Sequence, residues 1–401
     1  MRAVICGAGI AGLSLAQRLN TLDWDVVVVE KSPGPRSQGY MIDFFGPGYD
    51  AAEAMGVLPR LKELGYRAEA VSYLDESGRR RAGLDYARFG RMVADGRLLT
   101  IMRPDLELAL REHVKHVDLR FDRSISRIEN SAEGVHVTLT DGTALDADLL
   151  VGADGIHSTV RGMEFGCEAQ FFRYLGFHTA AYVFDDPRIY EQVRNRFCLT
   201  DTTGRQMGFY GLRDGRVAAF TVHRTPDPTL PEDVREAVRE AYATLGWVVP
   251  RALTRCPESS EVYYDQVAQI EMPRWSRGRV TLVGDACHAV SLLAGQGASL
   301  AVAGAYVLGE QLASADSVDS ALARYQKVWQ PVVTEKQQVA RRGAEWFLPS
   351  SSFRLWLRRI ALKLTNLPAL ERYFGPALAG KPVPIGELTS RRTAGRLRSI
   401  S

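Results

Sequence analysis

A glycine-rich turn near the N-terminus constrains the fold more strongly than any other feature of this chain. Its sequence, Gly7-Ala8-Gly9-Ile10-Ala11-Gly12, directly follows the apolar residues 3–6 and has the spacing G-x-G-x-x-G. Apolar residues then recur at a spacing typical of one helix face, and residues 26–29 form a second apolar run. The segment therefore predicts a βαβ unit, the building block of doubly wound parallel sheets.

The same spacing indicates a phosphate-bearing ligand. The first glycine permits a tight bend, the second lets a diphosphate approach the backbone, and the third packs helix against strand. Glu30 follows the second strand, 23 residues after Gly7, where a carboxylate can accept hydrogen bonds from ribose hydroxyls. A purely structural turn is the alternative, and the fingerprint alone does not choose between NAD and FAD. We expect a dinucleotide to contact Gly7, Gly9, Ile10, Ala11, Gly12, Glu30 and Lys31.

The rest of the chain is predicted to contain a second sheet and a helical end. Apolar runs at 148–152 and 279–284 lead into glycine turns and belong with the first unit, whereas 177–184, 206–212, 217–223 and 262–269 are typical of antiparallel strands. Residues 320–345 predict a helix with a kink or break at Pro331. A basic amphipathic helix at 353–364 is expected to cover the protein body rather than a membrane, and the last dozen residues are expected to be disordered.

These patterns predict an α/β fold, with a Rossmann-like domain, an inserted and mainly antiparallel β-sheet domain, and C-terminal helices. The expected boundaries are 1–69, 99–170 and 276–340 for the first domain, 70–98 and 171–275 for the second, and 341–401 for the C-terminal helices with a disordered basic tail.

Composition excludes several classes of function. The net charge is only +3, and four arginines lie in the last stretch, so no nucleic-acid partner is indicated. The five cysteines are scattered, and no metal-binding spacing occurs, which argues against a disulfide framework or a metal site. No apolar run reaches membrane-spanning length and no cleavage-site pattern follows Met1. We expect a cytoplasmic protein without integral membrane association; its oligomeric state stays open.

Two further motifs narrow the class of cofactor. One is Gly152-Ala153-Asp154-Gly155-Ile156-His157-Ser158-Thr159-Val160-Arg161, and the other is Gly284-Asp285-Ala286-Cys287-His288, followed by Ala294-Gly295-Gln296-Gly297-Ala298. Together with the first turn, and in this order, they resemble the class A flavoprotein monooxygenases, the para-hydroxybenzoate hydroxylase-like family, over roughly residues 1–340. The resemblance implies an FAD-binding domain and adds contacts from Asp154, Gly155, Gly284, Asp285, Gly295, Gln296, Gly297 and Ala298.

The chemistry of Asp285 agrees with that implication. A carboxylate would repel a diphosphate, but it can accept a hydrogen bond from a ribityl hydroxyl. The helix after Ala298 would direct its positive end at the flavin pyrimidine, where reduced flavin carries negative charge. A turn-forming aspartate is the alternative for Asp285.

The resemblance also assigns three arginines and Asp43. Arg103 matches the family's FAD-contacting arginine, with a helix-capping arginine as the alternative. The stretch Arg36-Ser37-Gln38-Gly39-Tyr40-Met41-Ile42-Asp43 resembles the flavin-proximal loop of the tetracycline-inactivating branch. That likeness implies that Arg36 assists nicotinamide-nucleotide binding and that Asp43 binds FAD; an ordinary surface loop is the alternative. Arg161 either steers the reduced nicotinamide nucleotide or pairs with a nearby acid.

One position departs from the family, and several histidines and tyrosines are ambiguous. Leu292 stands where the family usually has a proline close to the oxygen-reacting side of the flavin. Histidines in such turns are usually structural, which is our interpretation of His157 and His288. His178, Tyr182, Tyr210 and His223 lie on predicted strands, where packing or a solvent-facing position is favoured over hydrogen bonding to a phenolic substrate. No catalytic residue is assigned.

The resemblance implies an FAD-dependent monooxygenase that consumes NADPH or NADH. It would insert one oxygen atom from O2 into an aromatic or polycyclic small molecule, by hydroxylation first of all, through a flavin C4a-hydroperoxide. Baeyer–Villiger oxidation and epoxidation also occur in the family. The alternatives are a non-oxygenating flavoprotein (a halogenase, reductase or oxidase) and a catalytically silent flavin- or ligand-binding protein. The halogenase signature W-x-W-x-I-P is missing, since no two tryptophans are two residues apart.

Overall fold

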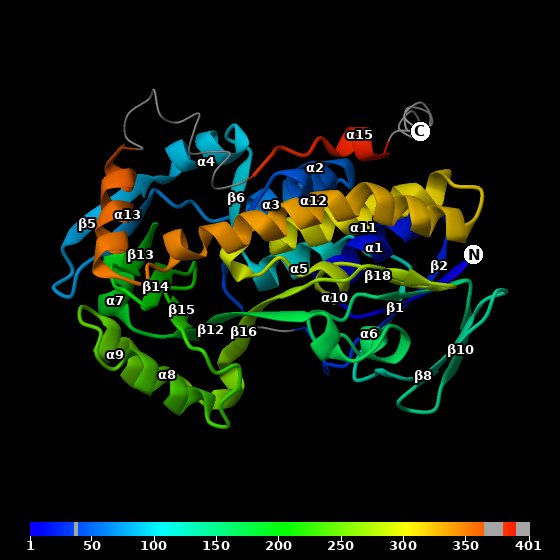
Figure 1. The fold of residues 1–401 in the computed structure, drawn as a ribbon, viewed down its shortest axis with the longest axis horizontal. Helices are drawn as coiled ribbons and strands as arrows, with labels where there is room; N and C mark the ends of the chain where they lie inside the picture. Colours follow the sequence, from blue (N-terminus) through cyan, green and yellow to red (C-terminus); the bar gives the residue numbers. More distant parts are fainter. Residues whose placement is uncertain (36–38, 365–379, 390–401) are drawn as a thin grey trace.

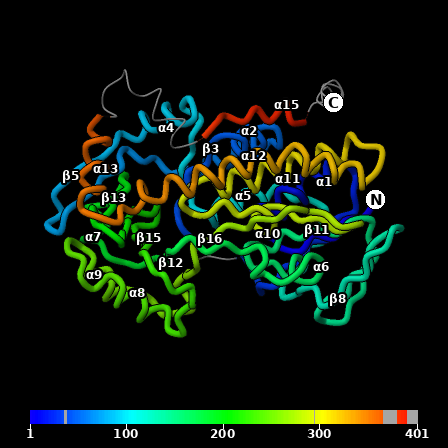
Figure 2. The backbone as a smooth tube through the Cα atoms, viewed as in Figure 1, coloured from blue at the N-terminus to red at the C-terminus, as the bar shows by residue number. Residues whose placement is uncertain are grey.

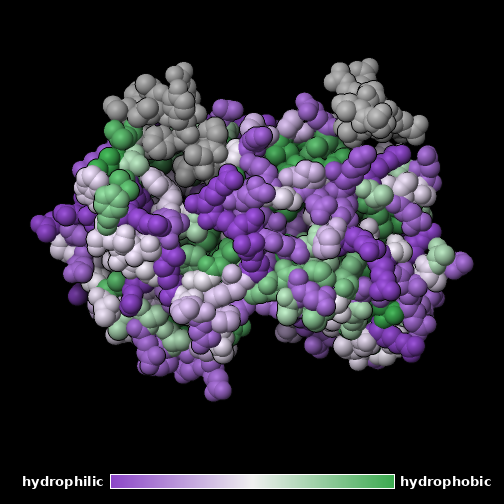
Figure 3. All heavy atoms as spheres, viewed as in Figure 1, coloured by the Kyte–Doolittle hydropathy of each residue, from purple (hydrophilic) through white to green (hydrophobic). Residues whose placement is uncertain are grey.

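The computed structural model describes residues 1–35, 39–364 and 380–389. Arg36 and the basic tail beyond residue 389 therefore lie outside the described residues. Two parts lie side by side, each built around its own sheet, and long helices run along one side of them (Figures 1 and 2). The face shown in Figure 3 is predominantly hydrophilic, with smaller apolar areas. No helix in the described ranges is long and apolar enough to cross a membrane.

A six-stranded sheet forms the centre of the first part. Its order is β17 (Ser276–Arg277), β18 (Val280–Leu282), β11 (Leu149–Gly152), β1 (Arg2–Cys6), β2 (Asp25–Val29) and β7 (Asp118–Arg120). All neighbours are parallel except β17 and β18. The inner strands are covered on both faces, so their side chains are apolar and buried. The predicted βαβ unit is confirmed, with α1 (Ile10–Asn20) between β1 and β2.

Helices and small sheets complete this part. Figure 1 shows α1, α11 (Gly297–Ser314) and α12 (Val318–Phe347) along one side of the parallel sheet. The antiparallel strands β8 (Ile125–Asn130), β9 (Val135–Leu139) and β10 (Ala144–Ala147) form a separate three-stranded sheet. A ribbon of β3 (Met41–Phe45) and β6 (Leu98–Met102) leads into α5 (Arg103–Glu112). The helices α2 (Pro47–Ala54), α3 (Leu58–Leu64) and α6 (Thr159–Glu164) fill the remaining connections.

The second part is a seven-stranded sheet in the order β16 (Tyr263–Ile270), β12 (Phe172–Phe184), β15 (Val217–Arg224), β14 (Arg205–Gly211), β13 (Arg196–Thr200), β4 (Ala70–Leu74) and β5 (Arg80–Asp85). The four strands predicted from 177–269 are present and antiparallel to their neighbours among themselves. The sequence did not predict β13, which pairs with β4 in parallel. The assigned domain boundaries stay a prediction.

One face of this sheet is covered by α7 (Pro187–Val193), α8 (Val234–Tyr242) and α9 (Val249–Thr254). Alternate residues of the strands, such as Ala180 and Tyr182, are buried against these helices. The intervening residues face the first part of the molecule. The sheet therefore has a sealed face and a face that can line a ligand site.

The C-terminal helices join the two parts. The break expected at Pro331 does not occur, because α12 runs continuously from Val318 to Phe347. Trp329 and Val333 are buried on either side of the proline, and this packing holds the helix together despite the missing N–H. The basic helix α13 (Ser352–Leu364) covers the protein body, as predicted, although Phe353 and Trp356 remain exposed.

The attachment of α13 depends on a buried ion cluster. Arg358 Nη2 donates to Asp201 Oδ1 at 2.9 Å, and Arg359 Nε donates to the other carboxylate oxygen at 2.6 Å. Asp201 and Arg358 are both buried. The Arg358 guanidinium also lies over the Tyr73 ring, 4.4 Å from its centroid. Because a buried carboxylate needs its counter-charges, this cluster fixes the helix on the sheet.

We predict that Arg358→Ala lowers the free energy of unfolding by about 3 kcal/mol, because it leaves Asp201 buried with a single cation. Arg354→Ala, on the same helix, removes an exposed pair with Glu345. This control is expected to cost less than about 1 kcal/mol. Urea denaturation of both variants checks the difference; equal losses would contradict the assigned role of Asp201.

Candidate functional site

The glycine turn at residues 7–12 adopts a conformation that requires glycine at two of its positions. Gly7 has φ +110°, and a Cβ there would collide with the carbonyl oxygen of Ala153. A Cβ on Gly12 would collide with the carbonyl oxygen of Gly7. These two positions bring β1, α1 and the loop after β11 into backbone contact.

Gly9 is different, because nothing in the protein requires it to be glycine. Its φ of −82° and ψ of −170° are open to any residue. A Cβ there would meet only Glu107 Oε1, at 3.7 Å. Gly9 caps the N-terminus of α1 and lines an open cavity. The absence of a side chain at Gly9 leaves space beside the N-terminus of α1, where backbone N–H groups without helical partners can bind an anion.

Glu30 and Lys31 border this cavity at the end of β2. The Glu30 carboxylate accepts from the backbone N–H of Ala8 at 2.8 Å and of Ser32 at 2.9 Å. These bonds tie the glycine turn to the next strand. The Lys31 side chain is exposed.

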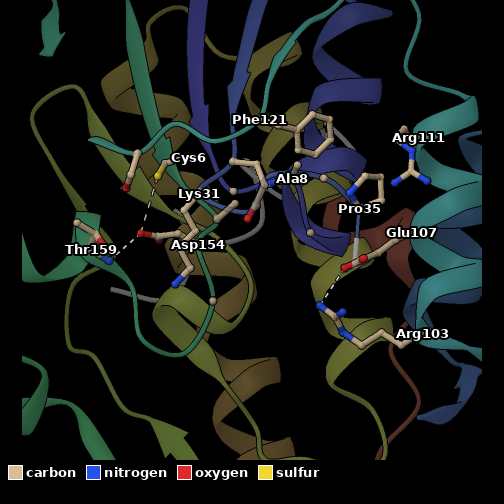
Figure 4. A pocket seen from close by; sticks show the side chains of 17 residues that line it. Cys6, Ala8, Lys31, Pro35, Arg103, Glu107, Arg111, Phe121, Asp154 and Thr159 are labelled. Carbon is tan, nitrogen blue, oxygen red and sulfur yellow. Dashed lines mark hydrogen bonds and ion pairs between the residues drawn. The ribbon is translucent and has the colours of Figure 1, made fainter. Parts of the chain in front are cut away.

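The motif after β11 is shaped by Asp154. Its carboxylate accepts from the backbone N–H of Thr159 at 2.7 Å and from Ser158 Oγ at 2.5 Å. Gly155 has φ +83°, which makes the turn possible. Asp154 and Gly155 both line the cavity beside Gly9. Figure 4 shows Asp154, Thr159 and Lys31 on one side of it, with Arg103 and Glu107 on the other.

Arg161 is fully buried, and its guanidinium bonds within the protein. Nη1 donates to the carbonyl oxygen of Ala286 at 2.9 Å, and Nη2 donates to Glu168 Oε2 at 2.8 Å. The structure therefore shows the pairing with a nearby acid, and its burial argues against the contact with a nicotinamide nucleotide. Arg161 instead ties the loop after β11 to the turn after β18.

That turn places Asp285 at the cleft. Gly284 has φ +64°, and a Cβ there would lie 2.7 Å from the Cβ of Ala11, so this turn packs closely on α1. Asp285 begins the short helix α10 (Asp285–His288) and its side chain is exposed to the cleft. The pKa of Asp285 is raised above its ordinary value. Desolvation by the surrounding protein is the largest cause, Asp265 adds to it, and the positive charge of Arg103 opposes it. His288 is buried within α10, and burial lowers its pKa to about 4, as expected for a structural histidine.

Arg103 lies at the centre of the site. It is the first residue of α5 and forms an ion pair with Glu107 Oε1 at 2.9 Å. It borders both the cavity at the glycine turn and a second cavity of about 340 Å³ toward the seven-stranded sheet. The two cavities also share Gly9, Ala153 and Gly155, so they adjoin one another and together are called the cleft.

The second cavity receives the N-terminus of α11. Gly295 has φ +61°, Gln296 is buried, and the helix begins at Gly297. Gly295, Gly297, Ala298 and Leu292 line the cavity. Ser291 has φ +78°, a left-handed conformation that is strained for a non-glycine residue.

Asp43 lies where the cleft meets an apolar chamber of about 290 Å³. Its carboxylate accepts from the hydroxyl of Tyr86, at the start of α4 (Tyr86–Ala94), and from Thr100 Oγ1 at 3.1 Å. Burial raises the pKa of Asp43, and the two hydroxyl donors partly oppose this. The chamber shares Phe197, Leu199, Leu292, Gly295 and Phe347 with the cleft.

The seven-stranded sheet contributes residues that no motif indicated. Thr179, Phe220, Tyr263, Asp265 and Val267 line the second cavity. Of the four residues weighed in the sequence, His178 bonds Tyr264, His223 bonds Tyr242, and Tyr182 donates to Ala252 O, while Tyr210 accepts from Met41 N. All four bond within the protein, and His178, Tyr182 and Tyr210 are buried. The alternation of strand residues could have separated the two faces, had the covered face been known.

His157 joins the two parts of the molecule. Nδ1 lies 3.1 Å from Glu168 Oε1, and Nε2 lies 3.3 Å from Asp265 Oδ1 on β16. The hydrogen bond to Asp265 is the largest cause that raises the pKa of His157, to about 9; the bond to Glu168 adds to it, and partial burial opposes it. His157 is therefore a cationic link to the wall of the cleft, the structural role expected for it.

Comparison with known proteins identifies the class. A family model described as FAD binding domain matches residues 1–340. An uncharacterised protein of Mycobacterium tuberculosis, Rv1260, is 34% identical over 83% of this chain and 91% of its own length. A flavin-dependent monooxygenase from an unknown prokaryotic organism is 29% identical over 87% of this chain and 90% of its own length.

Solved structures of similar fold point to the same class of protein. The tetracycline destructase Tet(55) is 26% identical, with a TM-score of 0.79, covering 95% of this chain and 98% of that one. Klebsiella pneumoniae HpxO, solved with FAD and uric acid, is 22% identical, with a TM-score of 0.78, covering 96% and 98%. The chain belongs to the FAD-binding-domain family and is an FAD-dependent class A monooxygenase. The fold class, the cofactor FAD and the monooxygenase class predicted from the sequence are confirmed.

We predict that the His157 link stabilises the protein at neutral pH and is lost in alkali. Its folded pKa of about 9 exceeds the ordinary 6.5. Its contribution is therefore fully present below pH 6.5 and disappears as pH rises through about 9. The gap in unfolding free energy between the wild type and His157→Gln should be larger at about pH 6 than at about pH 10. A gap independent of pH would contradict the link.

Proposed function

We propose that the protein hydroxylates an aromatic or polycyclic, largely apolar molecule, with O2 and a reduced nicotinamide nucleotide as co-substrates. The observation that carries this proposal is that three spaces adjoin one another. The cavities that border Gly9 and Asp285 meet an apolar chamber at Asp43 and Leu292. The substrates named for two similar folds, a tetracycline and uric acid, are also multi-ring molecules. We place the reaction in the cytoplasm.

Five features of the cleft fit FAD. Gly9 leaves room for a diphosphate at the N-terminus of α1, and Glu30 lies where ribose hydroxyls would reach it. Asp285 can accept a hydrogen bond from the ribityl chain. The N-terminus of the 18-residue helix α11 faces the space left for the flavin ring. Ser291 Oγ is buried without a hydrogen-bond partner in the described part of the chain and borders the same space.

When bound, FAD supplies electron transfer from the nicotinamide nucleotide and activation of O2. The residues of this chain bind, orient and exclude water. Phe197, Leu199 and Phe347 form an apolar wall common to cleft and chamber, which favours a ring substrate and keeps the site dry. The positive end of α11 would stabilise negative charge on the pyrimidine of a bound flavin. Asp43, held by Tyr86 and Thr100, lies at the entrance of the chamber.

We predict that Gly9→Ala folds normally but loses FAD. The added methyl group has room in the protein, so stability should change by less than about 1 kcal/mol. It would occupy the space of the diphosphate, so FAD affinity should fall roughly tenfold or more. Gly12→Ala is the matched control, since it disturbs the turn itself and should lower stability as well. Urea denaturation and titration with FAD measure both effects. Retention of FAD by a stable Gly9→Ala would show that the turn does not hold the diphosphate.

Turnover tests the proposal directly. With multi-ring phenols as candidates, one compound should stimulate NAD(P)H oxidation and yield a product with one 18O atom from 18O2. Catalase separates this coupled reaction from peroxide release. Flavin that NAD(P)H never reduces, with or without any candidate, would overturn the proposal.

Gly343 offers a variant specific to the chamber. It lies on α12, lines the chamber, and a Cβ there would meet no atom within 4 Å. Gly343→Leu should fill the chamber and raise KM for a large substrate roughly tenfold. FAD retention and the rate of flavin reduction should not change. An unchanged KM would mean that the substrate does not enter the chamber.

A further inference from the structure

A second charged pocket lies outside the cleft, at the end of the seven-stranded sheet. It is a cavity of about 300 Å³ lined by four arginines and by no acidic residue. The arginines are Arg67, Arg194, Arg196 and Arg213. They come from three separate segments: the link from α3 to β4, the turn after α7 with the first residue of β13, and the turn after β14. Four arginines around one cavity make this arginine pocket a candidate anion site.

The positive charge of the arginine pocket is poorly compensated. Within residues 1–35, 39–364 and 380–389, Arg67 and Arg196 have no hydrogen bond or ion pair to another side chain. Arg194 reaches Glu191 only at 3.7 Å, and Arg213 reaches Asp105 at 3.4 Å; the side chains of both pairs are partly or largely exposed. Such exposed pairs contribute little, so the four cations repel one another unless an anion enters.

The framework of the arginine pocket is fixed. The guanidinium of Arg213 lies 4.2 Å from the Tyr66 ring centroid and donates to the carbonyl oxygen of Gly65 at 2.9 Å. Tyr210 accepts from Met41 N at 2.5 Å and stacks on Phe197, with ring centroids 4.9 Å apart. A ligand would therefore bind to a preformed wall rather than order a loose loop.

The arginine pocket adjoins the flavin cleft. Met41 and Phe197 line both spaces. Asp105, the ion-pair partner of Arg213, lies two residues after Arg103, which borders the cleft. A molecule with an anionic group at one end and a redox-active ring at the other could occupy both spaces.

We propose that the arginine pocket binds the 2′-phosphate of NADPH, which makes it the docking point of the reductant. This inference rests on the proposed use of a nicotinamide nucleotide. A phosphate monoester concentrates nearly two negative charges on one group at neutral pH, whereas each phosphorus of the diphosphate carries one. Arginine's planar fork matches phosphate oxygens in pairs, which explains four arginines rather than lysines. The pocket thereby selects NADPH over NADH.

Binding to the FAD-loaded protein tests the inference without turnover. Calorimetry should show NADP⁺ binding roughly tenfold or more tightly than NAD⁺, since the two differ only in the 2′-phosphate. Arg67→Gln/Arg196→Gln should bring this ratio close to one and leave FAD retention unchanged. Arg127→Gln, an exposed arginine on β8, is the control and should leave the ratio as in the wild type. Equal affinities in the wild type, or a ratio that survives the double variant, would overturn the proposal.

Steady-state kinetics shows whether the arginine pocket binds the reductant or an anionic substrate. The double variant should raise KM for NADPH and leave KM for NADH and for the organic substrate unchanged. If KM for the organic substrate rises instead, the arginine pocket binds that substrate and the proposal is wrong. Failure to find a hydroxylated compound would count against the proposed function alone, because the NADP⁺ to NAD⁺ ratio is measured without substrate.

Discussion

The site depends on the close approach of three backbone turns at the carboxyl ends of β1, β11 and β18. Gly7 lies against the carbonyl of Ala153, and Gly284 lies against Ala11. Arg161 closes the arrangement from behind by donating to Ala286 O. Any side chain at these glycines would separate the turns. Their contact creates a concave surface of backbone N–H groups at the positive end of α1, which is what a bound diphosphate requires.

The opposite wall comes from a sheet that packs its own helices on the other face. This wall must keep a fixed position relative to the glycine turns, which belong to the other part of the molecule. His157 and α12 provide the connection. The histidine is held between Glu168 and Asp265, and α12 passes along both parts (Figure 2). These links hold the flavin and substrate walls of the cleft together.

The sequence predicted what local spacing determines. The βαβ unit, the ordered motifs and the alternating strands of 177–269 follow from residues near one another in the chain. Features that depend on contacts between residues far apart in the chain could not be predicted. β13 is short and was missed because its pairing with β4 joins segments more than a hundred residues apart. Pro331 suggested a break that burial of Trp329 and Val333 prevents. Arg161 left two roles open, and only the position of Glu168 and Ala286 separates them.

Phe197 shows how the three spaces are related. Its side chain lines the flavin cleft, the apolar chamber and the arginine pocket. The ring stacks on Tyr210, whose hydroxyl accepts from the backbone of Met41 at the start of β3. The strand that carries Asp43 is thus anchored, through Tyr210, to a ring that borders spaces of different charge. A charged reductant and an apolar substrate can then approach the same cofactor from different sides, because the arginine pocket and the apolar chamber each adjoin the cleft and the chamber excludes a phosphate.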